Sequence, residues 1–190
     1  MRRTTMFVVC TLALTLCAVY ATAAEPADTL KVDYFANANT AGAPDATVRL
    51  TNAGSSGVNI CADIFVYDSS QELSECCSCL ITPNGLLTLS VNKALTANPL
   101  TGVTLNTGTI SIVSAKTTAG ACPLPTAAIA PTSGVRSWAT HIQNSNFTIT
   151  EGASQDATLS AGELGVLQND CYAVNLIGSG KGQCSCSPGE

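Results

Sequence analysis

The sequence predicts a mainly β protein, a disulfide-stapled antiparallel β-sandwich with one C-terminal amphipathic helix. Short stretches in which apolar and polar residues alternate are separated by turn residues, a pattern typical of sandwiches. The apolar period lengthens to that of a helix only after Ser160. Eight of the ten cysteines lie beyond residue 23, and a clustered, even set of this kind is typical of a disulfide framework.

The N-terminal segment has the three parts of an export signal. Two arginines precede an uncharged apolar run over residues 6–18, and Ala21-Thr22-Ala23 offers small residues where a signal peptidase cleaves. We therefore expect residues 1–23 to be removed as a signal peptide, together with Cys10 and Cys17. The mature protein is then expected to be secreted, to the extracellular space or the periplasm. The apolar run is too short to span a membrane comfortably, so no membrane association is expected after cleavage.

The composition favours an extracellular β protein and argues against nucleic-acid binding. The formal net charge is −5, and the few basic residues are dispersed along the chain. Proteins that bind nucleic acids instead present a concentrated basic surface. Charged residues make up 11% of the chain and aromatic residues 5%, so the core must be packed largely from small side chains. Cross-links that each contribute about 2–4 kcal/mol would then matter for stability.

The residues after the signal peptide are expected to form one domain. Residues 24–116 carry the strand patterns of the β-sandwich body. Residues 117–137 are rich in Pro, Gly and Ala, which predicts a linker or long crossover pinned by Cys122. Residues 138–190 are predicted to form a β-hairpin, the helix and a Cys-rich tail, packed on the body.

The strongest alternation spans residues 58–66. Its aliphatic side chains fall on one face of a strand, whereas Phe65 and Tyr67 fall on the reverse face. Because that reverse face is too apolar for solvent, we expect a central strand that is half covered there. Residues 47–51 also alternate, and the turn residues over 52–57 favour a hairpin between the two strands.

Two further turns punctuate the body. Thr82-Pro83-Asn84-Gly85 combines a proline that presets φ with residues that tolerate positive φ, so a turn is expected there. A strand is predicted over residues 87–91. Residues 103–105 and 110–112 are predicted to pair as a hairpin across 106–108.

The C-terminal part contains a hairpin followed by the helix. Strands over residues 138–142 and 147–150 are expected to pair across 143–145. Ser160 and Glu163 form a capping box, in which each side chain satisfies a free amide at the helix start. One apolar stripe follows at helical spacing: Leu164, Leu167, Cys171 and Val174. Gly178 or Gly180 is expected to end the helix.

Several of these motifs together resemble a set of cysteine-rich secreted proteins recurrent in acidobacterial genomes. The resemblance rests on Cys61-x-Asp-Ile-Phe-Val-Tyr-Asp68, Gln71-Glu72-Leu73, Glu75-Cys-Cys-Ser-Cys79, Thr82-Pro-Asn-Gly-Leu86, Trp138-Ala-Thr-His141, Thr158-Leu-Ser-Ala-Gly-Glu-Leu164 and Gly178-Ser-Gly-Lys-Gly-Gln-Cys-Ser-Cys186. These segments lie within stretches that cover over half of the mature chain. The resemblance implies bacterial secretion and carries no function with it.

All eight cysteines of the mature chain are expected to be oxidised. They are Cys61, Cys76, Cys77, Cys79, Cys122, Cys171, Cys184 and Cys186. Cys171 lies on the apolar stripe of the helix, and the Gly-rich residues 178–182 can return the tail along it. We therefore expect Cys171 to pair with Cys184 or Cys186, with Cys184 favoured by the shorter loop. The other tail cysteine then pairs elsewhere, for example with the Cys76 to Cys79 cluster.

The alternative for the clustered cysteines is a site for a thiophilic ion such as Cu(I), because closely spaced thiolates suit soft metals. Zinc usually takes more widely spaced pairs. Export favours oxidation and no histidine accompanies the clusters, so we expect no metal and no cofactor. A redox role is less well supported, because these cysteines are predicted to lie in turns and not as Cys-x-x-Cys at a helix start.

Four side chains are weak candidates for a ligand site: Trp138, His141, Phe65 and Tyr67. Aromatic rings, including those of Tyr34 and Phe35, can stack on sugars, but such scarce aromatics usually enter the core. His141 is the single histidine. No Gly-x-Ser-x-Gly nucleophile elbow accompanies it, so a packed or surface role is expected.

Three functions of different classes remain. The leading one is a non-catalytic secreted structural or surface protein, a matrix, filament or adhesion component stabilised by disulfides. Its partners would be further copies of itself or a cell-surface partner. The second is a secreted module that binds a glycan or small ligand, and the third is a secreted enzyme that uses His141. Concave placement of the aromatic residues would favour the second, and a cleft with His141 beside a carboxylate and a hydroxyl would favour the third.

Overall fold

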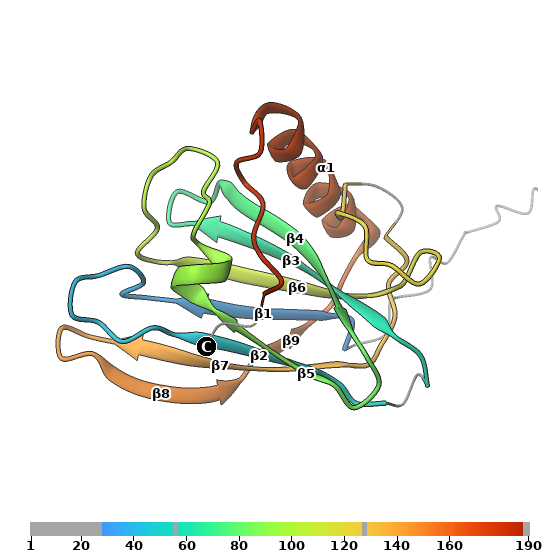
Figure 1. Ribbon diagram of the computed structural model, residues 1–190, viewed down its shortest axis with the longest axis horizontal. Coiled ribbons are helices and arrows are strands. Elements are labelled where there is room, and N and C mark those ends of the chain that lie inside the picture. The colour runs from blue at the N-terminus through green and yellow to red at the C-terminus, as the bar shows by residue number, and fades with distance from the viewer. Residues whose placement is uncertain (1–27, 55–56, 127–128, 188–190) are drawn as a thin grey trace, which may run out of the picture.

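The computed structural model describes residues 28–54, 57–126 and 129–187. The predicted signal peptide and its cleavage site lie outside the described residues. Two antiparallel sheets face each other, and a helix near the C-terminus covers the outer face of one of them (Figure 1). The elements are β1 (Leu30–Phe35), β2 (Thr47–Asn52), β3 (Ile60–Asp68), β4 (Leu73–Ile81), β5 (Leu86–Ser90), the π-helix η1 (Val91–Leu95), β6 (Gly108–Lys116), β7 (Val135–Gln143), β8 (Thr148–Ala153), β9 (Gln155–Ala157) and α1 (Ala161–Ile177).

Sheet A has five strands in the order β4-β3-β6-β1-β9, and sheet B has four in the order β5-β2-β7-β8. Neighbouring strands in both sheets are antiparallel. The predicted fold class, a mainly β sandwich with one C-terminal helix, is confirmed. Among the described residues, no helix is both long and apolar enough to cross a membrane.

The main core lies between the two sheets. Strand β3 contributes one aliphatic face to it, and Leu50 of β2 and Leu89 of β5 approach from sheet B. The other face of β3 is covered as well, because Phe65 belongs to a second core between sheet A and α1, with Cys76, Leu167 and Cys171. An interior strand with both faces apolar was expected for this stretch, and β3 lies between β4 and β6.

The helix begins and ends where the sequence predicts. Ser160 is the N-cap, and its hydroxyl accepts a hydrogen bond from the Glu163 backbone N–H at 3.0 Å. The Gly178 N–H donates to Val174 O at 2.8 Å as the C-cap. The predicted apolar stripe is the buried face: Leu167, Cys171 and Val174 are buried, and Leu164 is partly buried against the same core.

The turn at Thr82 to Gly85 and the C-terminal hairpin are also confirmed. The Gly85 N–H donates to Thr82 O at 2.8 Å, and Asn84 has φ of 59°. β7 and β8 pair from Trp138 opposite Ala153 to Gln143 opposite Thr148.

The two other predicted hairpins are wrong. β2 pairs with β5 and β7 in sheet B, whereas β3 lies in sheet A, so β2 and β3 do not form a hairpin. The buried Asn52 side chain donates to the carbonyls of Val58 and Ile81 and links the two sheets. Alternation reports which side of a strand is buried, and it does not identify the neighbouring strand.

In the second case, only the later half of the predicted hairpin is a strand. Val103 is 67% exposed and lies in the loop before β6. Residue Asn106 is held by the loop that follows β1, because it exchanges backbone and side-chain bonds with Ala38. The residues before β6 are therefore held by a loop, and not by the strand with which the hairpin prediction paired them.

Candidate functional site

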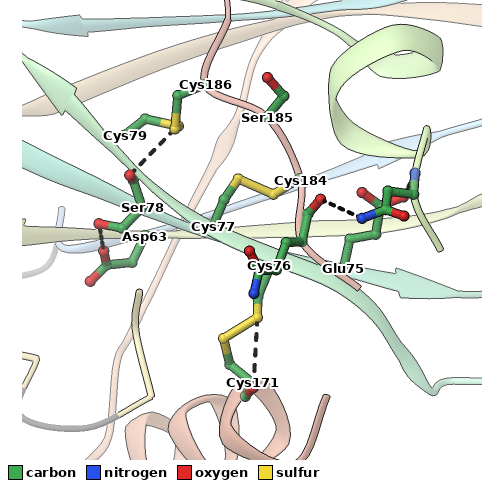
Figure 2. The surroundings of a disulfide bond; sticks show 12 residues. Asp63, Glu75, Cys76, Cys77, Ser78, Cys79, Cys171, Cys184, Ser185 and Cys186 are labelled. Carbon is green, nitrogen blue, oxygen red and sulfur yellow. Dashed lines mark hydrogen bonds between the residues drawn. A yellow bond between two sulfur atoms is a disulfide. The ribbon is translucent and has the colours of Figure 1, made fainter. Parts of the chain in front are cut away.

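The eight cysteines beyond residue 23 form four disulfides. These bonds join Cys61 to Cys122, Cys76 to Cys171, Cys77 to Cys184 and Cys79 to Cys186. Three of them leave from β4, which Figure 2 shows running between the helix on one side and the C-terminal tail on the other. The segment containing these cysteines was expected to be a turn. That expectation is wrong, because the segment forms strand β4 from Leu73 to Ile81, which is buried on both faces.

The partner of Cys171 is Cys76, so the expected bond to Cys184 or Cys186 is wrong. Successive side chains of a strand point to opposite faces. Cys76 therefore meets α1, whereas Cys77 and Cys79 point to the main core. Both tail cysteines are used on that second face, which leaves Cys76 as the cysteine of β4 that lies under the helix.

The tail follows the outer edge of β4 in a parallel direction. The Cys76 N–H donates to Gly182 O at 2.9 Å, and the Cys184 N–H donates to Cys76 O at 3.3 Å. The Ser185 N–H donates to Ala94 O of η1 at 2.9 Å. The tail thus covers an edge of sheet A whose backbone groups would otherwise be free to pair with another chain.

A soft-metal site at these cysteines requires thiolates. In the described residues, Cys77, Cys79 and Cys186 form the one group of three potential ligand residues whose ligand atoms lie within 4.8 Å of one another. Each of these sulfurs belongs to a disulfide. A disulfide sulfur carries no negative charge to offer a metal ion, so the oxidised cluster does not fit Cu(I).

Two carboxyl groups are buried close to this strand. Glu75 is fully buried, its Oε1 accepts the Asn98 N–H at 2.9 Å, and its Oε2 has no partner in the described residues (Figure 2). Burial raises the pKa of Glu75 to about 8. Asp63 on β3 accepts the Ser78 hydroxyl, and burial, partly offset by this bond, raises its pKa to about 7. Glu75 is therefore mainly an uncharged acid at neutral pH.

His141 of β7, in sheet B, contacts β1 of sheet A close to the residue that connects β8 to β9. Its Nε2 lies 2.6 Å from Asp33 Oδ1 of β1, and the Ser154 hydroxyl donates to Asp33 Oδ2 at 2.7 Å. The ring of Tyr34 stacks on the imidazole with centroids 4.3 Å apart. The carboxylate is thus shared by the imidazole and the hydroxyl. Because Ser154 bonds Asp33 and not His141, this is not the nucleophile–base arrangement of a serine hydrolase.

The four candidate ligand residues lie in different places. Phe65 is fully buried under α1, and His141 is enclosed between Asp33 and Tyr34. Trp138 is 40% exposed on the outer face of sheet B. Tyr67 alone of the four lines a sizeable cavity.

That cavity has a volume of about 660 Å³ and opens between the first turns of α1 and the outer face of sheet A. Tyr34 and Tyr67 supply its aromatic walls, and Asp68, Glu163 and Asp170 its carboxylates. The Tyr67 hydroxyl donates to Asp170 Oδ2 at 3.0 Å. The pKa of Tyr67 is raised by burial, by this bond, and by the charges of Asp170 and Glu163.

Sequence reasoning assigned Glu163 to the helix cap and did not single out Asp170. A signal for both was present, because Glu163, Val166 and Asp170 follow helical spacing one position before the apolar stripe. A partly acidic stripe next to the buried one marks the helix face that borders the sheet.

Compared with known proteins, the chain matches no family model, no curated protein and no solved structure. Four disulfides are typical of proteins of oxidising compartments, the extracellular space or the periplasm.

Proposed function

We propose that the protein is a non-catalytic secreted structural or surface component that associates with further copies of itself through the edge strand β8. The observation that carries the proposal is that β8 is an exposed edge of sheet B without the devices that usually block such edges.

The edge strands of the two sheets differ in how well they are protected from pairing with another chain. The β4 edge is covered by the disulfide-bonded tail, and β9 is only three residues long. β5 ends in the buried residues Leu89 and Ser90. β8 has six residues that are exposed at nearly every position, contains no proline, and carries Glu151 as its single charge.

The pairing pattern identifies which backbone groups of β8 are free. The Ser154 N–H donates to Ser137 O at 3.0 Å, which makes these two residues a hydrogen-bonded pair. Because such pairs alternate along an antiparallel ladder, Ile149 and Glu151 direct their N–H and C=O groups away from β7. Pairing of these groups with the same strand of a second copy gives a closed two-fold dimer.

The outer face of sheet B adds apolar surface beside that edge. Trp138 lies opposite Ala153 of β8, and Ile149 is 58% exposed. Arg49 crosses the same face to pair with Glu151 at 2.6 Å, which neutralises the one charge of the edge. A neutral edge with apolar neighbours favours association over repulsion.

The test is the association state of the oxidised mature protein, measured by sedimentation velocity over a wide concentration range. We expect concentration-dependent dimers. Ile149→Pro removes an outward N–H without breaking a bond to β7, and should abolish them. Ile149→Thr is the matched control, because it loses the apolar side chain and keeps the N–H. A wild-type protein that stays monomeric, or dimers that persist in Ile149→Pro, would overturn the proposal; circular dichroism verifies the fold of both variants.

A further inference from the structure

The geometry points to the cavity between α1 and sheet A as a binding site for a small hydroxylated ligand that carries a protonated amine, of the amino-sugar class. This inference goes beyond a structural role. It requires no self-association, and its outcome is independent of the edge strand β8.

The cavity has the size and composition of a small-molecule site. Its volume of about 660 Å³ falls within the range of ligand pockets, which are typically lined by aromatic groups with a few placed polar groups. Strand residues and helix residues supply opposite walls, so the site is built on rigid elements. Tyr34 is held by its stack on His141, with the two ring planes inclined by 8°, and by the Gln143 side chain, which donates to its hydroxyl at 2.8 Å.

The charge of the cavity selects a cation. Among the described residues, Asp68, Glu163 and Asp170 line it, and no lysine, arginine or histidine does. The ion pairs found among the described residues involve four other carboxylates. The three carboxylates therefore line one open space without a basic partner, although Asp68 Oδ1 also accepts the N–H groups of Ser70 and Glu72. A bound ammonium group would relieve their mutual repulsion.

The spacing of the carboxylates favours an organic cation over a metal ion. Within the described part of the chain, no three carboxylate or histidine side chains bring ligand atoms within 4.8 Å of one another. Asp170 Oδ2 is also engaged by the Tyr67 hydroxyl. Calcium needs six to eight oxygens at about 2.3–2.6 Å, which this arrangement does not offer. An ammonium group on a larger body can instead contact one or two carboxylates.

The remaining lining fits the body of such a ligand. Tyr34 is 43% exposed and presents aromatic surface on which a pyranose ring can stack. Ser69 and Thr109 line the same space with hydroxyl-bearing side chains, and Gln71 adds an amide. The Thr107 hydroxyl donates to Phe35 O at 3.0 Å and can still accept a bond. These groups can bond sugar hydroxyls, whereas a simple alkyl amine has no hydroxyls to offer them.

The experiment is isothermal titration calorimetry of the oxidised mature protein with four probes. They are the β-1,4-linked glucosamine dimer, its N-acetylated counterpart, cellobiose and butane-1,4-diamine. We expect the glucosamine dimer to bind at least about tenfold more tightly than the other three, because only it combines charge and hydroxyls. Its affinity should fall as salt is added.

Three variants locate the site. Glu163→Gln and Asp170→Asn each remove one charge while keeping a hydrogen-bond acceptor, and each should weaken binding of the glucosamine dimer about fivefold or more. Glu72→Gln is the matched control, because Glu72 is an exposed acid that does not line this cavity. Thermal unfolding confirms that all three remain folded.

The outcomes separate the alternatives. Absence of binding, or equal binding by wild type, Glu163→Gln and Asp170→Asn, overturns the site. If butane-1,4-diamine binds as tightly as the glucosamine dimer, and a fourth variant, Tyr34→Leu, binds both unchanged, the amino-sugar class is overturned in favour of a simple amine site. A separate titration with calcium chloride tests the metal: tight binding of Ca²⁺, with no binding of the four organic probes, overturns the argument against a metal ion.

Discussion

Cys76 and Cys77 are adjacent in the chain, yet their disulfides leave β4 from opposite faces, one to α1 and the other to the tail. One strand is thereby fixed to the helix that covers sheet A and to the segment that covers its edge (Figure 2). The bond from Cys79 to Cys186 repeats the second connection two residues further along both segments.

The two tail disulfides should substitute for each other in holding the tail. Removing either pair by Cys→Ser replacement leaves the other bond in place, so trypsin should cleave after the exposed Lys181 no faster than in the wild type. Removing both pairs releases the tail that follows Cys171. The lost restriction of the unfolded chain should lower the unfolding free energy by about 3 kcal/mol or more. The measurement is the rate of cleavage after Lys181, followed by mass spectrometry after reduction, with urea unfolding in parallel. Rapid cleavage in either variant that lacks a single pair would show that the bonds are not redundant.

Glu75→Gln should flatten the pH dependence of stability. The pKa of Glu75 is about 8 in the folded protein, against an ordinary value of 4.5. The folded state therefore binds this proton more tightly, and the resulting stability is full below about pH 4 and lost as the pH rises through 8. Asp63, with a pKa of about 7, acts in the same direction.

The wild type should accordingly be more stable at pH 5 than at pH 9, as measured by urea unfolding. A difference of one unit between the folded and unfolded pKa corresponds to about 1.4 kcal/mol of stability. The wild type should therefore lose a few kcal/mol of unfolding free energy between pH 5 and pH 9, and Glu75→Gln should lose less. Glu72→Gln, an exposed acid on the preceding turn, should keep the wild-type slope. A slope unchanged in Glu75→Gln would mean that this carboxyl does not titrate as described.

Asp33→Ala should destabilise the junction of the two sheets. The buried carboxylate accepts bonds from His141, from Ser154 and from the Tyr34 N–H, and its loss removes all three bonds; the Ser154 hydroxyl keeps Ser137 Oγ as a partner at 2.7 Å. We expect a loss of about 3 kcal/mol, against about 1 kcal/mol for Ser154→Ala, which removes a single donor. Chemical denaturation compares the two, and equal losses would contradict a shared role of Asp33.

Gly182→Ala should be more harmful than Gly180→Ala, although both glycines have positive φ. A Cβ at Gly182 would lie 2.1 Å from Val174 Cγ1, whereas one at Gly180 meets nothing within 4 Å. Gly180→Ala should therefore cost only the backbone strain, about 1–2 kcal/mol. Gly182→Ala adds a clash that moves the tail from β4. Thermal unfolding of the two variants separates strain from contact, and similar midpoints would contradict the close approach.

The sequence was most informative where one signal had one physical meaning. Ser160 caps the helix because its hydroxyl accepts a bond from the Glu163 N–H, which lies only three residues away. The two faces of β3 could be anticipated because burial of a strand follows from its own alternation.

Prediction failed where the outcome depended on distant partners. The segment Leu73–Ile81 carries three cysteines, and their clustering obscured a strand that is buried on both faces. As a strand, it would have placed Cys76 opposite to Cys77 and Cys79. The shared spacing of two in Cys77/Cys79 and in Cys184/Cys186 would then have matched the tail to that face.

The lining of the cavity could be predicted only in part from the sequence, for the same reason. Tyr67 could be named as a candidate from its strand, but the acids opposite it come from α1, about 100 residues later in the chain. Sequence spacing shows that Glu163 and Asp170 share a helix face. Only the docking of α1 on sheet A shows that this face meets Tyr67.

The position of the tail in the sequence also determines when the disulfides of β4 can form during synthesis. Three of the four disulfides join β4 to cysteines that are synthesised 95 or 107 residues later, Cys171, Cys184 and Cys186. The three cysteines of β4 therefore emerge long before their partners, next to one another and able to form wrong bonds. This part of the fold is completed only after Cys186 has been made. A chain that stops before residue 184 leaves Cys77 and Cys79 as free thiols beside an open strand edge, which makes a late truncation a route to cross-linked aggregates.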